Sequence, residues 1–313
     1  MRIAARRAGQ GVGALCAAAY ALIVLGAIVR AQGAGLACPD WPLCFGRVVP
    51  DFDAKVALEW GHRALAGLVS LGLAGASAYL IRIPELRGLV ARALVVAWAL
   101  LGTQVVLGGL TVLLGLAPWT VTAHLLVGNA FCGTLFWIAR DLGEAGRLAS
   151  RERRRVPASI SLAVALCGAL LVGQLVLGGL VSGHYAGLAC SAFPTCDGHS
   201  VAPTFSGLIG LHVLHRLNAL ALALACIGLV WVTRGAGRVS SYAWVSLHLV
   251  VAQIAAGVVN VLGQLPVEIT ALHSALAAAL VLALALVARE AWESQSAAAP
   301  AESSLAHAME SVG

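Results

Sequence analysis

Charged side chains are scarce in this sequence. Asp, Glu, Lys and Arg together make up 11% of its 313 residues, whereas hydrophobic residues make up 60%. So few charges cannot cover the surface of a water-soluble globule of this length. The composition therefore excludes a soluble protein and indicates an integral membrane protein.

Eight apolar runs are long enough to cross a bilayer, which takes about 20 residues of helix. Helices are required because lipid offers no other partner for backbone polar groups. The first run follows three arginines, as in a signal peptide, but it is long enough to span and is kept as a helix. The sequence thus predicts an all-α membrane protein with transmembrane helices near residues 9–29, 60–81, 91–115, 119–139, 159–181, 208–232, 240–262 and 268–288.

The basic residues predict the orientation of these helices. The connections at 31–58, 115–119, 183–207 and 263–268 hold only Arg47 and Lys55, so the positive-inside rule directs them outward and both termini into the cytoplasm. The net charge of +6 does not indicate nucleic-acid binding, because the arginines lie where the topology requires them. The cytoplasmic arginines are Arg2, Arg6, Arg7, Arg82, Arg87, Arg92, Arg140, Arg147, Arg151, Arg153, Arg154, Arg155, Arg234, Arg238 and Arg289.

An internal repeat divides the chain. GAGLACPDWPLC at 33–44 returns as YAGLACSAFPTC at 185–196, and the dipeptide HR at 62–63 returns at 215–216. Further along, Gln104, Gly108 and His124 correspond to 253, 257 and 273. An even number of helices in each copy gives both copies the same direction through the membrane. We expect two tandem, same-orientation four-helix bundles at 1–140 and 159–293, a cytoplasmic linker at 141–158 and a disordered tail at 294–313.

Each predicted unit carries two histidines near the outer ends of its second and fourth helices. They are His62 and His124 in the first unit and His215 and His273 in the second. Two imidazoles at equal depth in a helical bundle can ligate a haem iron from its two faces. A membrane histidine can instead bond a neighbouring helix, and zinc would need a further ligand, for which the first unit offers Glu59. The symmetric arrangement favours haem.

These residues resemble the haem A synthase family. The resemblance rests on the duplicated eight-helix plan, the four histidines, and the motifs GAGLACPDWPLCFG at 33–46 and EWGHR at 59–63, and it covers roughly residues 10–288. It implies a membrane enzyme that oxidises a methyl group of haem O to a formyl group, giving haem A for terminal oxidases. It also implies that His62 and His124 ligate the substrate haem, that His215 and His273 ligate a haem b cofactor, and that Glu59 is catalytic.

The resemblance also implies a setting and partners. The enzyme is expected in the bacterial plasma membrane, surrounded by lipid, with its haem sites toward the outer side. Haem O is the expected substrate, and haem O synthase and an outside thiol or quinol electron donor are candidate partners; a homo-oligomer stays open. A non-catalytic two-haem electron carrier and a haem transporter are alternative functions.

The repeat is broken at Glu59, three residues before His62, because the counterpart three residues before His215 is His212. An ionisable carboxylate near a membrane site is costly, which suggests a function. A carboxylate that only marks the water interface is the alternative. The asymmetry favours catalysis in the first unit.

Three arginines are candidate partners of haem propionates. Arg63 and Arg216 directly follow histidines and can bind a propionate or extend to the interface. Arg30 is a candidate contact of the substrate propionate, because Ser182 replaces it in the second copy.

The two repeated loops face the oxidising side, where disulfides persist. We therefore predict the bonds Cys38–Cys44 and Cys190–Cys196. A structural role, in which each bond pins a loop over a haem, and a redox role, in which the first pair exchanges electrons with a thiol, both remain open. Trp41 in the first loop is expected to cover a porphyrin edge.

Overall fold

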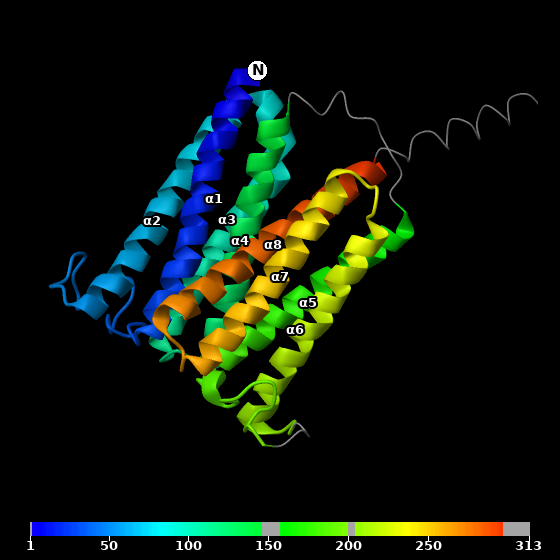
Figure 1. Ribbon diagram of the computed structural model, residues 1–313. Coiled ribbons are helices and arrows are strands. Elements are labelled where there is room, and N and C mark those ends of the chain that lie inside the picture. The colour runs from blue at the N-terminus through cyan, green and yellow to red at the C-terminus, as the bar shows by residue number, and fades with distance from the viewer. Residues whose placement is uncertain (1, 146–156, 200–203, 297–313) are drawn as a thin grey trace, which may run out of the picture.

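The computed structural model describes residues 2–145, 157–199 and 204–296, and eight long α-helices dominate these segments (Figure 1). All eight are long and apolar enough to cross a membrane, which confirms the predicted membrane protein. A short 3-10 helix, η2 (Ala186–Leu188), lies in one connection. The long helices are α1 (Arg2–Ala31), α2 (Ala54–Ile81), α3 (Pro84–Leu113), α4 (Pro118–Glu144), α5 (Ala158–Gly183), α6 (Gly207–Val232), α7 (Arg238–Leu262) and α8 (Val267–Ser296).

Several helices begin or end outside the predicted apolar runs. Helix α2 begins at Ala54 because the side chain of Asp53 caps it, accepting hydrogen bonds from the backbone nitrogens of Lys55 and Val56 at 2.8 and 2.9 Å. Polar residues in the first turn hid this start from a search for apolar runs. As a result, Glu59 lies well inside the helix.

The predicted linker and tail fall mostly outside the described residues. Helix α4 continues to Glu144 and α5 begins at Ala158, so only the two ends of the predicted linker at 141–158 are described. Helix α8 extends to Ser296, into the first residues of the predicted tail at 294–313. Arg147 and the arginines at 151 and 153–155 lie outside the described part.

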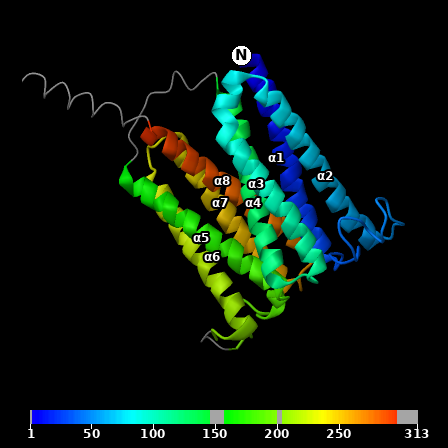
Figure 2. The same ribbon diagram turned by 180° about the vertical axis from the view of Figure 1, so that it is seen from behind.

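Neighbouring helices pack in two rings. Helix α2 packs against α1 and α3, and α4 packs against the same two helices, so α2 and α4 occupy opposite corners of the first ring (Figures 1 and 2). Helices α5 to α8 repeat this pattern, with α6 and α8 at opposite corners. Each ring has its own cluster of buried apolar side chains. A flat ligand between α2 and α4, or between α6 and α8, would lie across the centre of a ring.

The two rings meet where α1 and α4 contact α5 and α8. The closest approach brings α5 against α4. A Cβ atom at Gly179 would lie 2.9 Å from Cγ2 of Thr122, and one at Gly183 would lie 2.8 Å from Cα of Pro118. Two glycines four residues apart thus allow the two backbones to pack closely, as in many membrane helix pairs.

At the opposite end of the helices, a buried arginine joins α8 to α4. Arg289 is 1% exposed and donates to Asp141 Oδ1 at 2.8 Å and to Glu144 Oε2 at 3.2 Å. Arg140 also pairs with Glu144. Arg289, predicted from sequence as one of the topology-setting arginines, is therefore a fully paired interior residue, as a buried charge requires.

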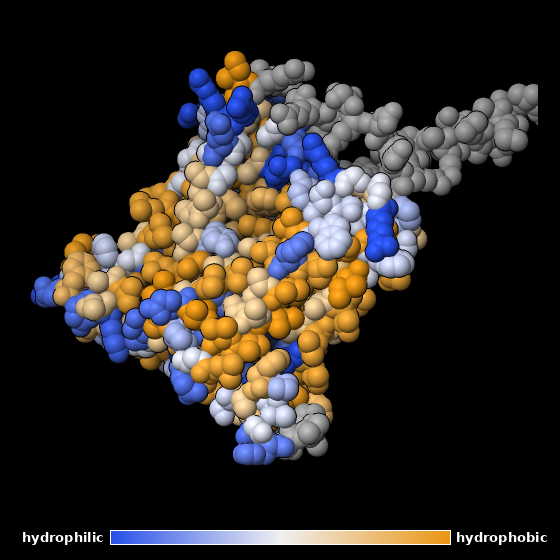
Figure 3. Space-filling model, viewed as in Figure 1, coloured by the Kyte–Doolittle hydropathy of each residue, from blue (hydrophilic) through white to orange (hydrophobic). Residues whose placement is uncertain are grey.

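Apolar residues cover the middle of the molecule, and hydrophilic residues gather toward its two ends (Figure 3). Many large apolar side chains on the helices are exposed, for example Leu71 and Leu162 at 72% each and Leu224 at 68%. Such a surface is suited to lipid and confirms a multi-pass membrane protein. The loops at 32–53, 184–199 and 204–206 lie at one end, here named the disulfide end.

Candidate functional site

The structure contains both predicted disulfides. The sulfur–sulfur distances are 2.01 Å for Cys38–Cys44 and 2.02 Å for Cys190–Cys196. Cys38 and Cys44 are 0% and 1% exposed, so the first bond is shielded from solvent. Each disulfide closes a short ring in a loop at the disulfide end.

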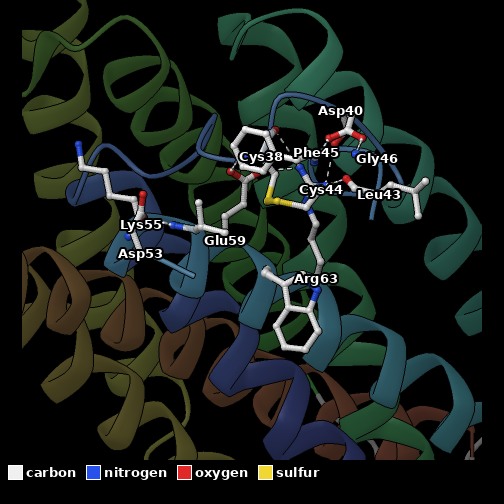
Figure 4. The surroundings of a disulfide bond; sticks show 12 residues. Cys38, Asp40, Leu43, Cys44, Phe45, Gly46, Asp53, Lys55, Glu59 and Arg63 are labelled. Atoms are coloured by element: carbon white, nitrogen blue, oxygen red, sulfur yellow. Dashed lines mark hydrogen bonds and ion pairs between the residues drawn. A yellow bond between two sulfur atoms is a disulfide. The ribbon is translucent and has the colours of Figure 1, made fainter. Parts of the chain in front are cut away.

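An ion pair on α2 holds the first disulfide loop (Figure 4). Arg63 Nη2 lies 2.5 Å from Glu59 Oε1, and the backbone nitrogen of Cys38 donates to Glu59 Oε2 at 2.9 Å. Arg63 also donates to three loop carbonyls: through Nη1 to Asp40 at 2.8 Å and Leu43 at 2.7 Å, and through Nη2 to Cys38 at 3.3 Å. These bonds compensate the burial of Glu59, which is 4% exposed.

A second carboxylate organises the tip of the same loop. Asp40 accepts hydrogen bonds from the backbone nitrogens of Phe45 at 2.7 Å and Gly46 at 2.8 Å. The bond from Gly46 is the main cause that holds the pKa of Asp40 below its ordinary value. This contact is therefore present when Asp40 is ionised, and it weakens as the pH falls through the lowered pKa.

The second loop is held in a related way by an arginine and an imidazole. Arg216, the counterpart of Arg63, donates to the carbonyls of Thr195 at 3.2 Å and Cys190 at 3.0 Å. His212 stands where Glu59 stands in the first copy, and its Nδ1 lies 3.1 Å from the carbonyl of Ala186. The carboxylate of Glu59 thus occurs only in the first copy of the repeat, and a buried imidazole, His212, takes its place in the second.

Each of the four candidate ligand histidines packs its ring edge against a glycine of the preceding helix. A Cβ atom at any of these glycines would lie 3.1 to 3.3 Å from the histidine Cε1, closer than an ordinary van der Waals contact. Because glycine has no side chain, each imidazole lies directly on the helix backbone, and this close contact restricts its rotation. The pairs are Gly26 with His62, Gly108 with His124, Gly178 with His215, and Gly257 with His273.

The arrangement fits two bis-histidine haem sites. His62 and His124 lie on helices at opposite corners of one ring, and the same holds for His215 and His273. The Nδ1 atoms of His62, His124 and His273 are buried on the ring edge that faces the glycines, without a hydrogen-bond partner of good geometry. Among the described residues, no group of three His, Cys, Asp or Glu side chains converges to hold a metal ion, and a zinc site would need three or four such ligands.

Trp41 packs against α3, the helix whose Gly108 contacts His124. A Cβ atom at Gly109 would lie 3.1 Å from Cδ2 of Trp41, so the indole rests on the backbone of α3. The adjacent Gly108 is the residue that packs against His124. The first loop therefore reaches over this part of α3, and the covering role of Trp41 stays a prediction.

Arg30 joins the two rings. Its Nη2 donates to the carbonyl of Ser182 at 2.8 Å, and its guanidinium lies 3.8 Å from the ring centroid of Tyr185. The predicted propionate contacts of Arg30, Arg63 and Arg216 remain predictions. For Arg63, the four observed bonds already engage both terminal nitrogens.

Sequence reasoning missed two features of the site. Gly26 and Gly178 are separated by the same 152 residues as the repeated cysteines, and this recurrence was a usable signal. The side chain of Gln174 lies within 3.2 Å of His215 Nδ1. No repeat pattern could reveal that contact, because Leu22 occupies the corresponding position.

The fold and the site together define a polytopic membrane protein with two buried histidine pairs suited to haem. Residues 12–285 match the model of the COX15-CtaA family, described as cytochrome oxidase assembly protein, and the chain belongs to this family. It is 28% identical to the "Heme A synthase" of Shewanella oneidensis, over 88% of this chain and 94% of that one. It is 30% identical to the "Heme A synthase" of Symbiobacterium thermophilum, over 81% of this chain and 85% of that one. The resemblance predicted from sequence is confirmed.

Proposed function

We propose that this protein is a haem A synthase, which oxidises a methyl group of haem O to a formyl group. The observation that carries the proposal is the match of residues 12–285 to the COX15-CtaA family in a chain with two histidine–glycine pairs in each ring. The alternative functions, a non-catalytic electron carrier and a haem transporter, share the histidines but require no proton acceptor or counter-charge beside the first pair, a role that the carboxylate of Glu59 can fill.

We propose that the two rings are tandem units with the same orientation. Corresponding helices make corresponding contacts in the two rings, and both disulfide loops lie at one end. That end faces the periplasm, since disulfides form there and the arginine-rich connections lie at the other side. Both termini then lie in the cytoplasm, as predicted from the sequence.

The two histidine pairs have different tasks in this proposal. His62 and His124 bind and orient the substrate haem O, whereas His215 and His273 hold haem b. Bound haem b supplies one-electron redox chemistry at the second site. The glycines that pack against the four imidazoles restrict their rotation, which would keep them oriented to hold a haem.

Glu59 is the proposed catalytic residue. Oxidation of a methyl to a formyl group passes through two hydroxylations and loss of water, so protons must leave the reacting edge. A carboxylate oxygen held by Arg63 and the Cys38 backbone nitrogen can accept a proton or balance developing positive charge. The corresponding residue of the second unit, His212, is bonded to its loop and serves as a structural contact.

We propose a structural role for the first disulfide. A thiolate from outside cannot reach sulfur atoms that are 0% and 1% exposed. The bond instead stabilises the loop that carries Trp41 and receives Glu59 and Arg63. The remaining partners predicted from the sequence, haem O synthase and an outside thiol or quinol donor, stay predictions.

Replacing Cys38 and Cys44 together with Ser tests the structural role. The chain-entropy model gives about 2 kcal/mol for so short a ring, so the thermal midpoint of haem release should fall while low-temperature turnover stays within a few-fold of the original. The matched control is the Cys190→Ser/Cys196→Ser variant, measured in the same detergent. Loss of turnover at an unchanged midpoint would instead indicate a redox disulfide.

Product analysis tests the function itself. The protein is expressed with and without a haem O supply, and the extracted haems are separated and identified by mass. We expect haem A only when haem O is supplied, together with haem b in both cases. Bound haem without any formylated product would support the electron carrier.

A further inference from the structure

The two histidine pairs differ in one polar contact. Gln174 Nε2 lies 3.2 Å from Nδ1 and 3.3 Å from Nε2 of His215. The side chain of Gln174 accepts a hydrogen bond from Asn218 Nδ2 at 2.8 Å, and this nitrogen also lies 2.9 Å from the carbonyl of Leu170. An amide pair, here the residues Gln174 and Asn218, is therefore anchored to backbone and contacts a candidate haem ligand.

The amide pair lies on the side of the second site that is away from the loops. Gln174 precedes Gly178 by four residues on α5, and Asn218 follows His215 by three residues on α6. Residues three or four apart share one helix face, so both amides flank the face that carries the glycine–histidine contact. Both are displaced by about one turn toward the membrane interior.

Leucines occupy the corresponding positions of the first site. Leu22 precedes Gly26 by four residues on α1, and Leu65 follows His62 by three residues on α2. Leu22 packs against the apolar core of the first ring. His62 Nδ1 is buried without the kind of side-chain partner that His215 has. On its α1–α2 side, the deep part of the first site therefore carries leucines where the α5–α6 side of the second carries amides.

Haem O and haem b differ at the edge that this deep side would meet. The two carboxylates of either haem favour the polar disulfide end, which directs the opposite edge inward. At that edge, haem O carries a long isoprenoid chain where haem b carries a vinyl group. An isoprenoid chain packs well on leucines, but against an amide pair it would displace hydrogen bonds without replacing them.

We propose that Gln174 and Asn218 determine specificity: they exclude an isoprenoid-bearing haem from the second site, while Leu22 and Leu65 admit it to the first. The proposal rests on the proposed function, because it takes the two sites to bind haem b and haem O. In this proposal, four side chains on α1, α2, α5 and α6 determine which haem each unit binds.

Competition between the two haems tests the second site in the full-length chain. A His62→Ala/His124→Ala background leaves the second site as the haem-binding site, and the purified protein is equilibrated with equal amounts of haem b and haem O. The ratio of the bound haems is then measured after acid extraction. We expect haem b almost exclusively in this background, and an increase of about tenfold in the haem O share when Q174L and N218L are added. An unchanged ratio in a variant with an intact low-spin spectrum would overturn the proposal.

The reciprocal change tests the first site independently. L22Q with L65N, in a His215→Ala/His273→Ala background, should lower haem O binding about tenfold relative to haem b. This variant keeps the proposal falsifiable if the amide variant fails to fold, and unchanged haem O preference would contradict it. Haem A formation is measured in the protein with all four histidines. If it forms haem A while the ratios in the variants stay unaltered, the specificity residues alone are rejected. If the ratios change while that protein forms no haem A, the proposed function alone is rejected.

Discussion

Glu59→Gln lowers haem A formation by about 10²-fold to 10⁴-fold, the usual contribution of a general acid or base. Gln keeps the size of the side chain and can still accept one hydrogen bond, from Cys38 or Arg63, but it cannot take up a proton as a carboxylate does. The low-spin haem spectrum should persist, because His62 and His124 are unchanged. The measurement is haem A produced per bound haem O in the purified protein.

His212→Gln is the matched control for this prediction. It changes the corresponding position of the second unit, which contacts the carbonyl of Ala186. We expect haem A formation within a few-fold of the original protein. Because Glu59 also pairs with Arg63, the thermal midpoint of each variant is measured as well. A Glu59→Gln protein with normal product yield would remove the catalytic assignment.

His215→Ala and His273→Ala each abolish the resident haem b signal. A single remaining imidazole would hold haem b more weakly, and no cluster of three His, Cys, Asp or Glu side chains among the described residues would replace the lost ligand. Dithionite-reduced spectra and pyridine haemochrome content give the measurement. His62→Ala should keep this signal and lose haem O binding instead, which separates the two sites.

His248→Ala provides the control for the loss of an imidazole. His248 is an exposed residue on α7, and its Nδ1 lies 2.7 Å from the carbonyl of Trp244 within the same helix. We expect an unchanged haem b content in this variant. Retention of haem b in both His215→Ala and His273→Ala would exclude the second site as we describe it.

The membrane fold could be predicted from the sequence because its cause is local. Apolar runs of sufficient length require helices in lipid, and all eight appear in the structure. The helix ends were predicted less accurately. Helix α2, for example, begins with a polar turn capped by Asp53, and a search for apolar runs does not detect such a turn. The disulfides followed from two cysteines in each short loop on the oxidising side.

Contacts made by irregular or distant segments could not be predicted. The bonds from Arg63 to loop carbonyls depend on how residues 38–43 turn back over α2, and no periodicity encodes that path. The contact between Gln174 and His215 depends on the packing of α5 against α6. Sequence identified the candidate histidines, and the structure shows which glycines they pack against.

Arg30 contacts the backbone of Ser182, the residue that the repeat aligns with it. Under the proposed duplication, a residue that touches its own counterpart lies near the two-fold axis that relates the two units. The same axis maps the contact between α1 and α8 onto the contact between α5 and α4, and both contacts are present. The two halves of the chain therefore contact each other as the subunits of an isologous dimer do. A four-helix ancestor could therefore have self-associated through the same faces before fusion, and fusion then freed each half to acquire its own pocket chemistry.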